Sequence, residues 1–318
     1  MSTATAAPTA QELGEARGIA AALLELSKAR LSALVVFTAV VGYLLGAADP
    51  LNWLRLAALA AGTTLSAFGA NALNQCLEIE RDRRMLRTRS RPLPAGDLSA
   101  AFAWRCAIVM AAAGPLLLAV GVNALTAGLS AACIAIYVLI YTPMKIRTTL
   151  NTLVGAVVGA IPPLMGWTAA TDGLGPGGLA LAAILFVWQI PHFLALAWLY
   201  RDDYARGGYR MLPLLDPDGR RTARVILLYS LMLVPVSLAL TLLSVTGMVY
   251  AVAALVLGCG LLALSVRLYV DRCDGNARRV FLASVIYLPL LLVAMSADRA
   301  PGRALPLPDS TSLLAAGP

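Results

Sequence analysis

Three oxygen-bearing side chains follow an apolar stretch at a spacing of four residues: Asn74, Glu78 and Asp82. On a helix this spacing places them along one face, about 6 Å apart per step. Such a stripe can hold a hard cation such as Mg²⁺, which usually takes one or two carboxylates together with phosphate oxygens. The sequence therefore predicts a catalytic magnesium site at these three residues, although a solvated helix end with charge pairs four residues apart has the same spacing.

Basic side chains accompany this stripe. Arg87 and Arg91 stand just downstream, and Lys145 and Arg147 occur together in a later polar stretch. Guanidinium groups suit phosphate oxygens because their donors form a planar fork. Cation-binding carboxylates beside phosphate-binding arginines are typical of a diphosphate site. We therefore predict that these four basic residues bind a diphosphate.

A second acidic cluster, Asp202 and Asp203, lies in another basic stretch beside Arg201 and Arg206. These two carboxylates could form a second metal site facing the first, so both are predicted metal ligands and Asp203 is also a predicted catalytic residue. An ordinary polar loop is the alternative.

The only histidine in the chain, His192, ends a nearby apolar stretch. A lone histidine there is usually packed and hydrogen-bonded, although neutral imidazole is also an axial ligand of haem iron.

The elements that must position these residues are membrane spans. Of the 318 residues, 59% are hydrophobic and 13% are charged, whereas a soluble domain has about 45–50% apolar and about 25% charged residues. A span needs about 20 largely apolar residues, and we predict an all-α, polytopic bundle of about nine spans. Their expected bounds are 31–48, 52–74, 99–119, 121–141, 151–170, 177–199, 223–244, 247–268 and 278–297.

The distribution of charge predicts the orientation. Of the 25 Lys and Arg residues, only Arg55, Arg299 and Arg303 fall on one side of this arrangement. The positive-inside rule makes the other side cytoplasmic, with the N-terminus inside and the C-terminus outside. The net charge of +8 then reflects topology and not a nucleic-acid partner. An Ala-, Leu- and Arg-rich chain without a transit peptide suggests a bacterial inner membrane.

The segments outside the spans carry weaker signals. Residues 1–30 are expected to be a cytoplasmic segment with a short interfacial helix, and residues 298–318 a loose polar tail. The domain between them, 31–297, holds the predicted site. The five cysteines are scattered without a Cys-x-x-Cys pair, so neither a disulfide framework nor a zinc site is expected.

Several of these motifs resemble one known family. The run from Asn74 through Asp82, followed by Met85, Arg87-Thr88 and Arg91-Pro92-Leu93, resembles the first aspartate-rich motif of the UbiA superfamily of intramembrane prenyltransferases, in its protohaem IX farnesyltransferase (haem O synthase) branch. Further matches occur in the same order between about residues 26 and 290. The first is Lys28 and Arg30, although Ala29 stands between them where the branch has proline. The others are the stretch from Tyr141 to Trp167, Pro191-His192-Phe193, Asp203-Tyr204, Met211-Leu212-Pro213, and the four residues Phe281, Ser284, Tyr287 and Leu288.

The resemblance implies a UbiA-like bundle and a reaction. In that branch a farnesyl group passes from farnesyl diphosphate to a vinyl group of haem b, water adds, and haem O and diphosphate form with Mg²⁺ as the cofactor. The resemblance makes Lys28 a further diphosphate ligand and His192 the candidate haem ligand. It also implies hand-over of haem O to a haem A synthase or terminal oxidase.

Two other functions stay open at this point. Many UbiA members prenylate an aromatic quinone precursor and carry a second Asp-x-x-x-Asp, but here Gly207 stands four residues after Asp203. This departure matches the haem branch and puts direct binding of a second metal in doubt. A transporter is the alternative from another class, and it would carry ionisable residues within its spans around a midplane site.

Overall fold

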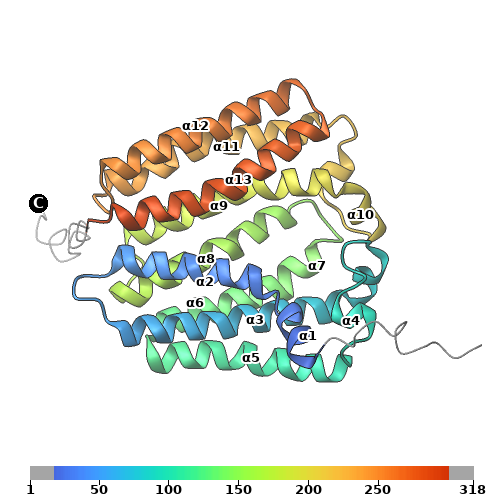
Figure 1. The fold of residues 1–318 in the computed structure, drawn as a ribbon, viewed down its shortest axis with the longest axis horizontal. Helices are drawn as coiled ribbons and strands as arrows, with labels where there is room; N and C mark the ends of the chain where they lie inside the picture. The colour runs from blue at the N-terminus through green and yellow to red at the C-terminus, as the bar shows by residue number, and fades with distance from the viewer. Residues whose placement is uncertain (1–17, 301–318) are drawn as a thin grey trace, which may run out of the picture.

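Long helices run side by side along one axis of the molecule (Figure 1). The computed structural model describes residues 18–300, and nine helices in this range are long and apolar enough to cross the roughly 30 Å of a bilayer core. The prediction of nine spans is thereby confirmed. They are α2 (Ala29–Gly46), α3 (Trp53–Arg84), α5 (Ala100–Gly121), α6 (Ala124–Ala135) with its continuation through η1 (Ile136–Tyr141) and α7 (Thr142–Met144), α8 (Asn151–Thr171), α9 (Pro176–Leu199), α11 (Arg220–Leu242), α12 (Met248–Val270) and α13 (Asp274–Ala297).

Helix α3 differs most from its predicted bounds. Its 32 residues make it about 48 Å long at 1.5 Å per residue, well beyond the thickness of a hydrocarbon core of about 30 Å. The predicted span ended at residue 74, where the hydropathy falls, but the helix continues to Arg84. Glu78 and Asp82 therefore stand on a rigid extension of a span.

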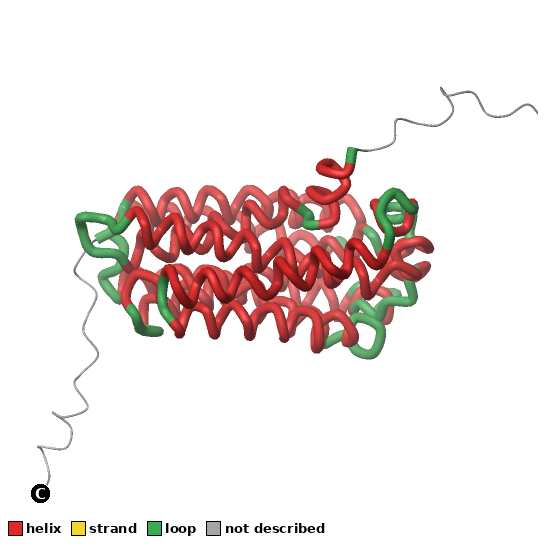
Figure 2. Tube along the Cα trace, turned by 90° about the horizontal axis from the view of Figure 1, so that it is seen from below, coloured by secondary structure: helices red, strands yellow, loops and turns green. Residues whose placement is uncertain are grey.

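Short elements gather at the end of the bundle to which α3 extends (Figure 1). They are α1 (Ile19–Leu26), α4 (Pro92–Ala95), α10 (Arg201–Arg206) and η2 (Leu212–Leu215). Helix α1 falls within the segment for which an interfacial helix was expected. The described chain begins at this end and finishes at the opposite one, as the tube in Figure 2 also shows.

At the opposite end of the bundle, ion pairs and hydrogen bonds connect the loops between the helices. Arg55 pairs with Asp172, and Arg299 donates to Asp49 at 2.7 Å. Residues 298–300, predicted as part of a loose tail, are bonded to the loop before α12, where the Gly247 amide donates to the Asp298 carbonyl at 2.9 Å. Residues 301–318 lie outside the described residues.

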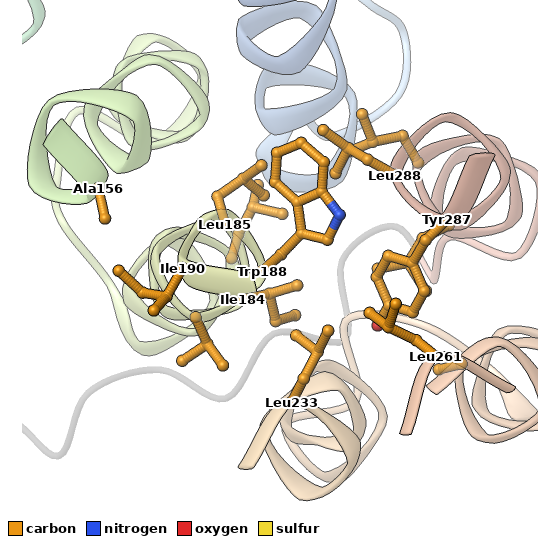
Figure 3. Packing of buried hydrophobic residues seen from close by; sticks show 14 of the residues in the cluster. Ala156, Ile184, Leu185, Trp188, Ile190, Leu233, Leu261, Tyr287 and Leu288 are labelled. Atoms are coloured by element: carbon orange, nitrogen blue, oxygen red, sulfur yellow. The ribbon is translucent and has the colours of Figure 1, made fainter. Parts of the chain in front are cut away.

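The largest apolar core supports α9 from one side. Figure 3 shows Trp188 of α9 and Tyr287 of α13 directed into the space between helices, together with Leu233 of α11 and Leu261 of α12. The Trp188 indole donates to the Ser284 carbonyl at 2.9 Å. Burial of such large side chains, with their polar atoms paired, holds α9 in a fixed rotation.

Helices α2 and α8 meet through small residues instead. A Cβ at Gly166 of α8 would lie 1.8 Å from the Ala39 carbonyl oxygen of α2, and one at Gly42 would lie 2.1 Å from that of Pro163. Such close backbone approach is a common form of packing between membrane helices. It leaves the remaining face of α8 free to line a cavity.

Candidate active site

The predicted stripe on α3 faces a cavity. Asn74, Glu78 and Asp82 are all buried, and all three line a hollow of about 360 Å³ at the end of the bundle with the short helices. The Asn74 amide donates to Glu78 Oε2 at 2.9 Å and to Thr142 Oγ1 at 3.1 Å. We call these three residues the α3 stripe.

Cationic side chains from three separate segments meet this stripe. Lys145 Nζ lies 3.0 Å from both carboxylate oxygens of Glu78. Arg91 Nη1 lies 2.7 Å from Asp82 Oδ2, and Lys28 Nζ donates to Asn74 Oδ1 at 3.1 Å. The structure therefore brings these three basic side chains to the residues of the α3 stripe.

The cavity carries an excess of positive charge. Its lining includes the two carboxylates of the α3 stripe and four basic residues, so the excess is two positive charges when Lys28 is protonated and one when it is neutral. A pocket of this composition favours a multiply charged anion, because each unpaired cation gains when an anion enters. The four cationic residues are Lys28, Arg87, Arg91 and Lys145.

The cavity changes the pKa values of its two lysines in opposite directions. Burial, with Arg91 and Lys145 nearby, lowers the pKa of Lys28 to about 7. Burial also opposes the charged form of Lys145, but the Glu78 carboxylate raises the pKa of Lys145 well above its ordinary value. Lys145 is therefore a permanent cation of the site, whereas Lys28 titrates near neutral pH.

The π-helical segment η1 aligns one wall of the cavity. In a regular α-helix of 3.6 residues per turn, positions eight residues apart diverge by about 80°. A π-helical turn is wider, and here it keeps Tyr137, Tyr141 and Lys145 on the cavity face together. The two tyrosine rings stack with centroids 5.4 Å apart, and Lys145 Nζ lies 4.8 Å from the Tyr141 centroid.

An apolar section adjoins the charged one. Leu31, Val35, Val158, Pro162 and Phe193 contribute to its lining. Helix α8 offers glycines there: a Cβ at position 155 would lie 2.8 Å from the Tyr141 ring, and one at position 159 would lie 2.0 Å from the Gln189 side chain. The cavity thus joins an anion site to a surface suited to a hydrocarbon chain.

The second acidic cluster does not line this cavity. The Asp203 carboxylate accepts backbone N–H groups of Leu86 at 2.7 Å and Arg87 at 3.2 Å, and Arg206 donates to it at 3.2 Å. Although burial favours its neutral form, these donors hold the pKa of Asp203 below its ordinary value. Asp202 is exposed on the outer side of α10. The structure therefore does not bring these carboxylates to the α3 stripe.

Arg147 and His192 also lie outside the cavity lining. Arg147 is exposed to solvent. His192 lies on the α13 side of α9, where its Nδ1 is 2.9 Å from Ser284 Oγ. Ser284 Oγ donates its own proton to the Phe281 carbonyl at 2.6 Å. It can therefore accept a hydrogen bond from Nδ1–H of His192, and Nε2 of that neutral ring keeps its lone pair.

Tyr209 and Met211 line the cavity but were not predicted as site residues, although Met211 belongs to a motif that carries the family resemblance. These two pack with Met85 and Ala197 in a small buried cluster that joins the loops of three spans. Aromatic and methionine side chains in a loop have no periodicity to mark them. Trp198, near the end of α9, is not part of the cavity lining, and its indole donates to Asp274 at 2.9 Å.

The α3 stripe fits a magnesium ion that also binds phosphate. Asp82 Oδ1 is buried and has no hydrogen-bond partner among the described residues. Such an orphaned anionic oxygen is costly unless a cation or water completes its shell. Within residues 18–300 no group of three or more His, Cys, Asp or Glu side chains could hold a metal. Two carboxylates and an amide suit an ion whose remaining ligands are water and phosphate oxygens.

Comparison with known proteins agrees with this geometry. A sequence model described as the UbiA prenyltransferase family matches residues 35–288. The protoheme IX farnesyltransferase of Solibacter usitatus (strain Ellin6076) is 45% identical over 285 residues, which cover 87% of this chain and 98% of that protein.

Two solved structures share the fold. A digeranylgeranylglyceryl phosphate synthase has a TM-score of 0.74 at 16% identity and covers 87% of this chain and 97% of its own. A UbiA homologue from Archaeoglobus fulgidus bound to GPP and Mg²⁺ has a TM-score of 0.61 at 14% identity and covers 86% of this chain and 99% of its own.

Proposed function

This chain belongs to the UbiA prenyltransferase family, and we propose that it transfers a farnesyl group from farnesyl diphosphate to a vinyl group of haem b, with addition of water, giving haem O and diphosphate. The observation that carries this proposal is the cavity in which the α3 stripe and an excess of cations adjoin an apolar lining. The name of the relative from Solibacter usitatus supports the two substrates.

The charged part of the cavity holds the diphosphate. Lys28, Arg87, Arg91 and Lys145 bind its oxygens, and their charges stabilise the negative charge that develops as the bond to the farnesyl carbon breaks. Asn74, Glu78 and Asp82 would hold Mg²⁺, which would supply further positive charge to the leaving group. The archaeal homologue bound to GPP and Mg²⁺ supports this use of the site. These groups are in place before ionisation, so they favour the transition state over the ground state.

The aromatic and apolar part holds the farnesyl chain. Tyr137 and Tyr141 present ring faces near the charged section, where they can stabilise an allylic cation. The terminal vinyl carbon of haem forms a bond to this cation, and the neighbouring vinyl carbon becomes cationic. Water adds there and loses a proton, leaving the hydroxyl group of haem O. The apolar lining excludes other water from the allylic cation until the acceptor is bound.

His192 orients the haem. Its Nδ1 proton is held by Ser284, so Nε2 is the nitrogen available to the iron. Gln189 and Phe193, its neighbours on α9, line the cavity, and their closeness to His192 supports this assignment. A titration of the protein with haem, followed by absorption spectroscopy, tests this assignment. The His192→Ala variant should lose the spectrum of a histidine-ligated iron, and an unchanged spectrum would exclude His192 as the ligand.

The site opens toward the cytoplasmic side of a bacterial inner membrane, with the N-terminus inside and the C-terminus outside. The basic loops around the cavity support this orientation through the positive-inside rule. Both substrates reach the apolar lining from the bilayer, and haem O passes on to a haem A synthase or terminal oxidase.

Reconstitution tests the reaction. Purified protein in lipid nanodiscs is mixed with farnesyl diphosphate, haem b and Mg²⁺, and the products are analysed by mass spectrometry. Haem O should form, and chelation of Mg²⁺ should abolish its formation. Absence of haem O together with prenylation of 4-hydroxybenzoate would replace the proposal by the quinone-precursor alternative.

A further inference from the structure

The Asp203 carboxylate joins α10 to the segment that follows α3. Its Oδ1 accepts the Leu86 amide at 2.7 Å and its Oδ2 accepts the Arg87 amide at 3.2 Å. Neither amide donates to a backbone carbonyl among the described residues. Asp203 is buried, and without it these two N–H groups would lose their acceptors within the protein.

The segment held in this way supplies much of the cation site. We call residues 85–91 the arginine loop, and its members Arg87, Thr88 and Arg91 line the cavity. The loop begins against the α3 stripe, where Thr88 Oγ1 donates to the Asp82 carbonyl at 3.0 Å. Asp203 is its anchor on the opposite side.

The same short helix also holds the Arg87 side chain. The guanidinium carbon of Arg87 lies 5.2 Å from the Tyr200 ring centroid and 5.7 Å from that of Tyr204. Both tyrosines belong to or adjoin α10. The backbone and the side chain of Arg87 thus both contact the α10 region, and Arg87 lines the cavity.

Both oxygens of Asp203 accept hydrogen bonds from the Leu86 and Arg87 amides. Asp82 Oδ1, in contrast, has no hydrogen-bond partner among the described residues and can bind a cation. We propose that Asp203 is a positioning residue that sets the arginine loop, and through it the Arg87 guanidinium, against the diphosphate, and that it does not bind the metal. This proposal rests on the proposed function in that the anion is taken to be the diphosphate of the prenyl donor.

Steady-state kinetics of Asp203→Asn test the proposal, with Asp202→Asn as the matched control from the same turn of α10. Asparagine keeps one acceptor oxygen and presents an NH₂ group to the second amide, so the loop shifts. We expect the KM for farnesyl diphosphate to rise about tenfold, kcat to fall less than about threefold, and the Mg²⁺ concentration for half-maximal activity to stay within about twofold. Asp202→Asn should match the wild type in all three quantities.

A rise in the Mg²⁺ requirement of Asp203→Asn comparable with that of Asp82→Asn would overturn the proposal, because a lost metal ligand is felt first in the metal dependence. So would a wild-type KM. Should Asp203→Asn fail to fold, Asp203→Glu keeps the charge but displaces the loop by one methylene, and the same selective rise in KM is expected from it.

A double-mutant cycle identifies the route. If Asp203 acts through Arg87, then Asp203→Asn changes KM less than about twofold in an Arg87→Ala background, although it acts about tenfold in the wild type. Additive effects would overturn this route.

Calorimetric titration with inorganic diphosphate and Mg²⁺ gives the same comparison without turnover. A wild type that binds diphosphate but makes no haem O would contradict the proposed function alone, whereas equal diphosphate affinity in wild type and Asp203→Asn would contradict the positioning role alone.

Discussion

The two acidic clusters of this protein look alike in sequence and differ in space. The carboxylates of the α3 stripe stand on a long helix and face the cavity, where their partners are lysine and arginine side chains. Asp203 faces backbone amides of another loop, and Asp202 faces solvent. Asp82 of the first cluster has a buried oxygen without a hydrogen-bond partner among the described residues, whereas both oxygens of Asp203 accept hydrogen bonds.

This difference shows that what decides the role of a carboxylate is the nature of its donors. Lysine and arginine side chains can exchange a carboxylate for a phosphate, because several rotatable bonds separate them from the backbone. Backbone amides of a packed loop have no such freedom. A carboxylate held by amides therefore stabilises a conformation, whereas one held by side chains remains open to a metal.

The sharpest test of the comparison lies in the α3 stripe. Glu78→Gln and Asp82→Asn should each lower kcat for haem O formation by about 10²- to 10⁴-fold, since each removes a carboxylate that would hold the Mg²⁺ beside the leaving diphosphate. The substitutions keep side-chain size, so the circular dichroism spectrum and the melting temperature should stay near those of the wild type. Turnover close to the wild type in both variants would remove the metal site from the mechanism.

The arginine loop gives the next largest effect. Arg87→Ala should raise the KM for farnesyl diphosphate about 10- to 30-fold, the value of a lost charged hydrogen bond of about 1.5–2 kcal/mol. The control is Arg147→Ala, because Arg147 was predicted as a phosphate ligand but is exposed and outside the cavity lining. Equal defects in the two variants would show that the loops rearrange when the donor binds.

The sequence was sufficient for the spans and for the α3 stripe. Spans follow from hydropathy, and the stripe follows from the spacing of Asn74, Glu78 and Asp82 on one helix, which is a local property. The role of Asp203 was not predictable, because its hydrogen-bond partners lie 116 and 117 residues away in the chain. Nor was the π-helical turn that aligns Tyr137 with Lys145, since no residue pattern marks such a turn.

A smaller effect separates the two lysines of the cavity by pH. Lys28 titrates at about 7 in the free protein, and a bound diphosphate must raise that pKa because it favours the charged form. Binding then takes up a proton above pH 7, so the KM for farnesyl diphosphate should rise by about fivefold between pH 7 and pH 8. The Lys28→Arg variant stays charged and should show a flat profile in this window. An identical rise in Lys28→Arg would assign the titration to another group.

The smallest effect concerns the ion pairs of the two clusters. Arg91 pairs with buried Asp82 at 2.7 Å and keeps 20% of its side chain exposed, whereas Arg206 pairs with Asp203 at 3.2 Å and keeps 47% exposed. Exposed pairs contribute about 0–1 kcal/mol. Asp203 also retains its two amide donors without Arg206. Arg206→Ala should therefore change the KM for farnesyl diphosphate by less than about twofold, even at low salt, where a weak pair counts most. A tenfold change would mean that the guanidinium of Arg206, and not the loop amides, sets the position of Asp203. The distinction between backbone-amide donors and side-chain donors would then not hold at this residue.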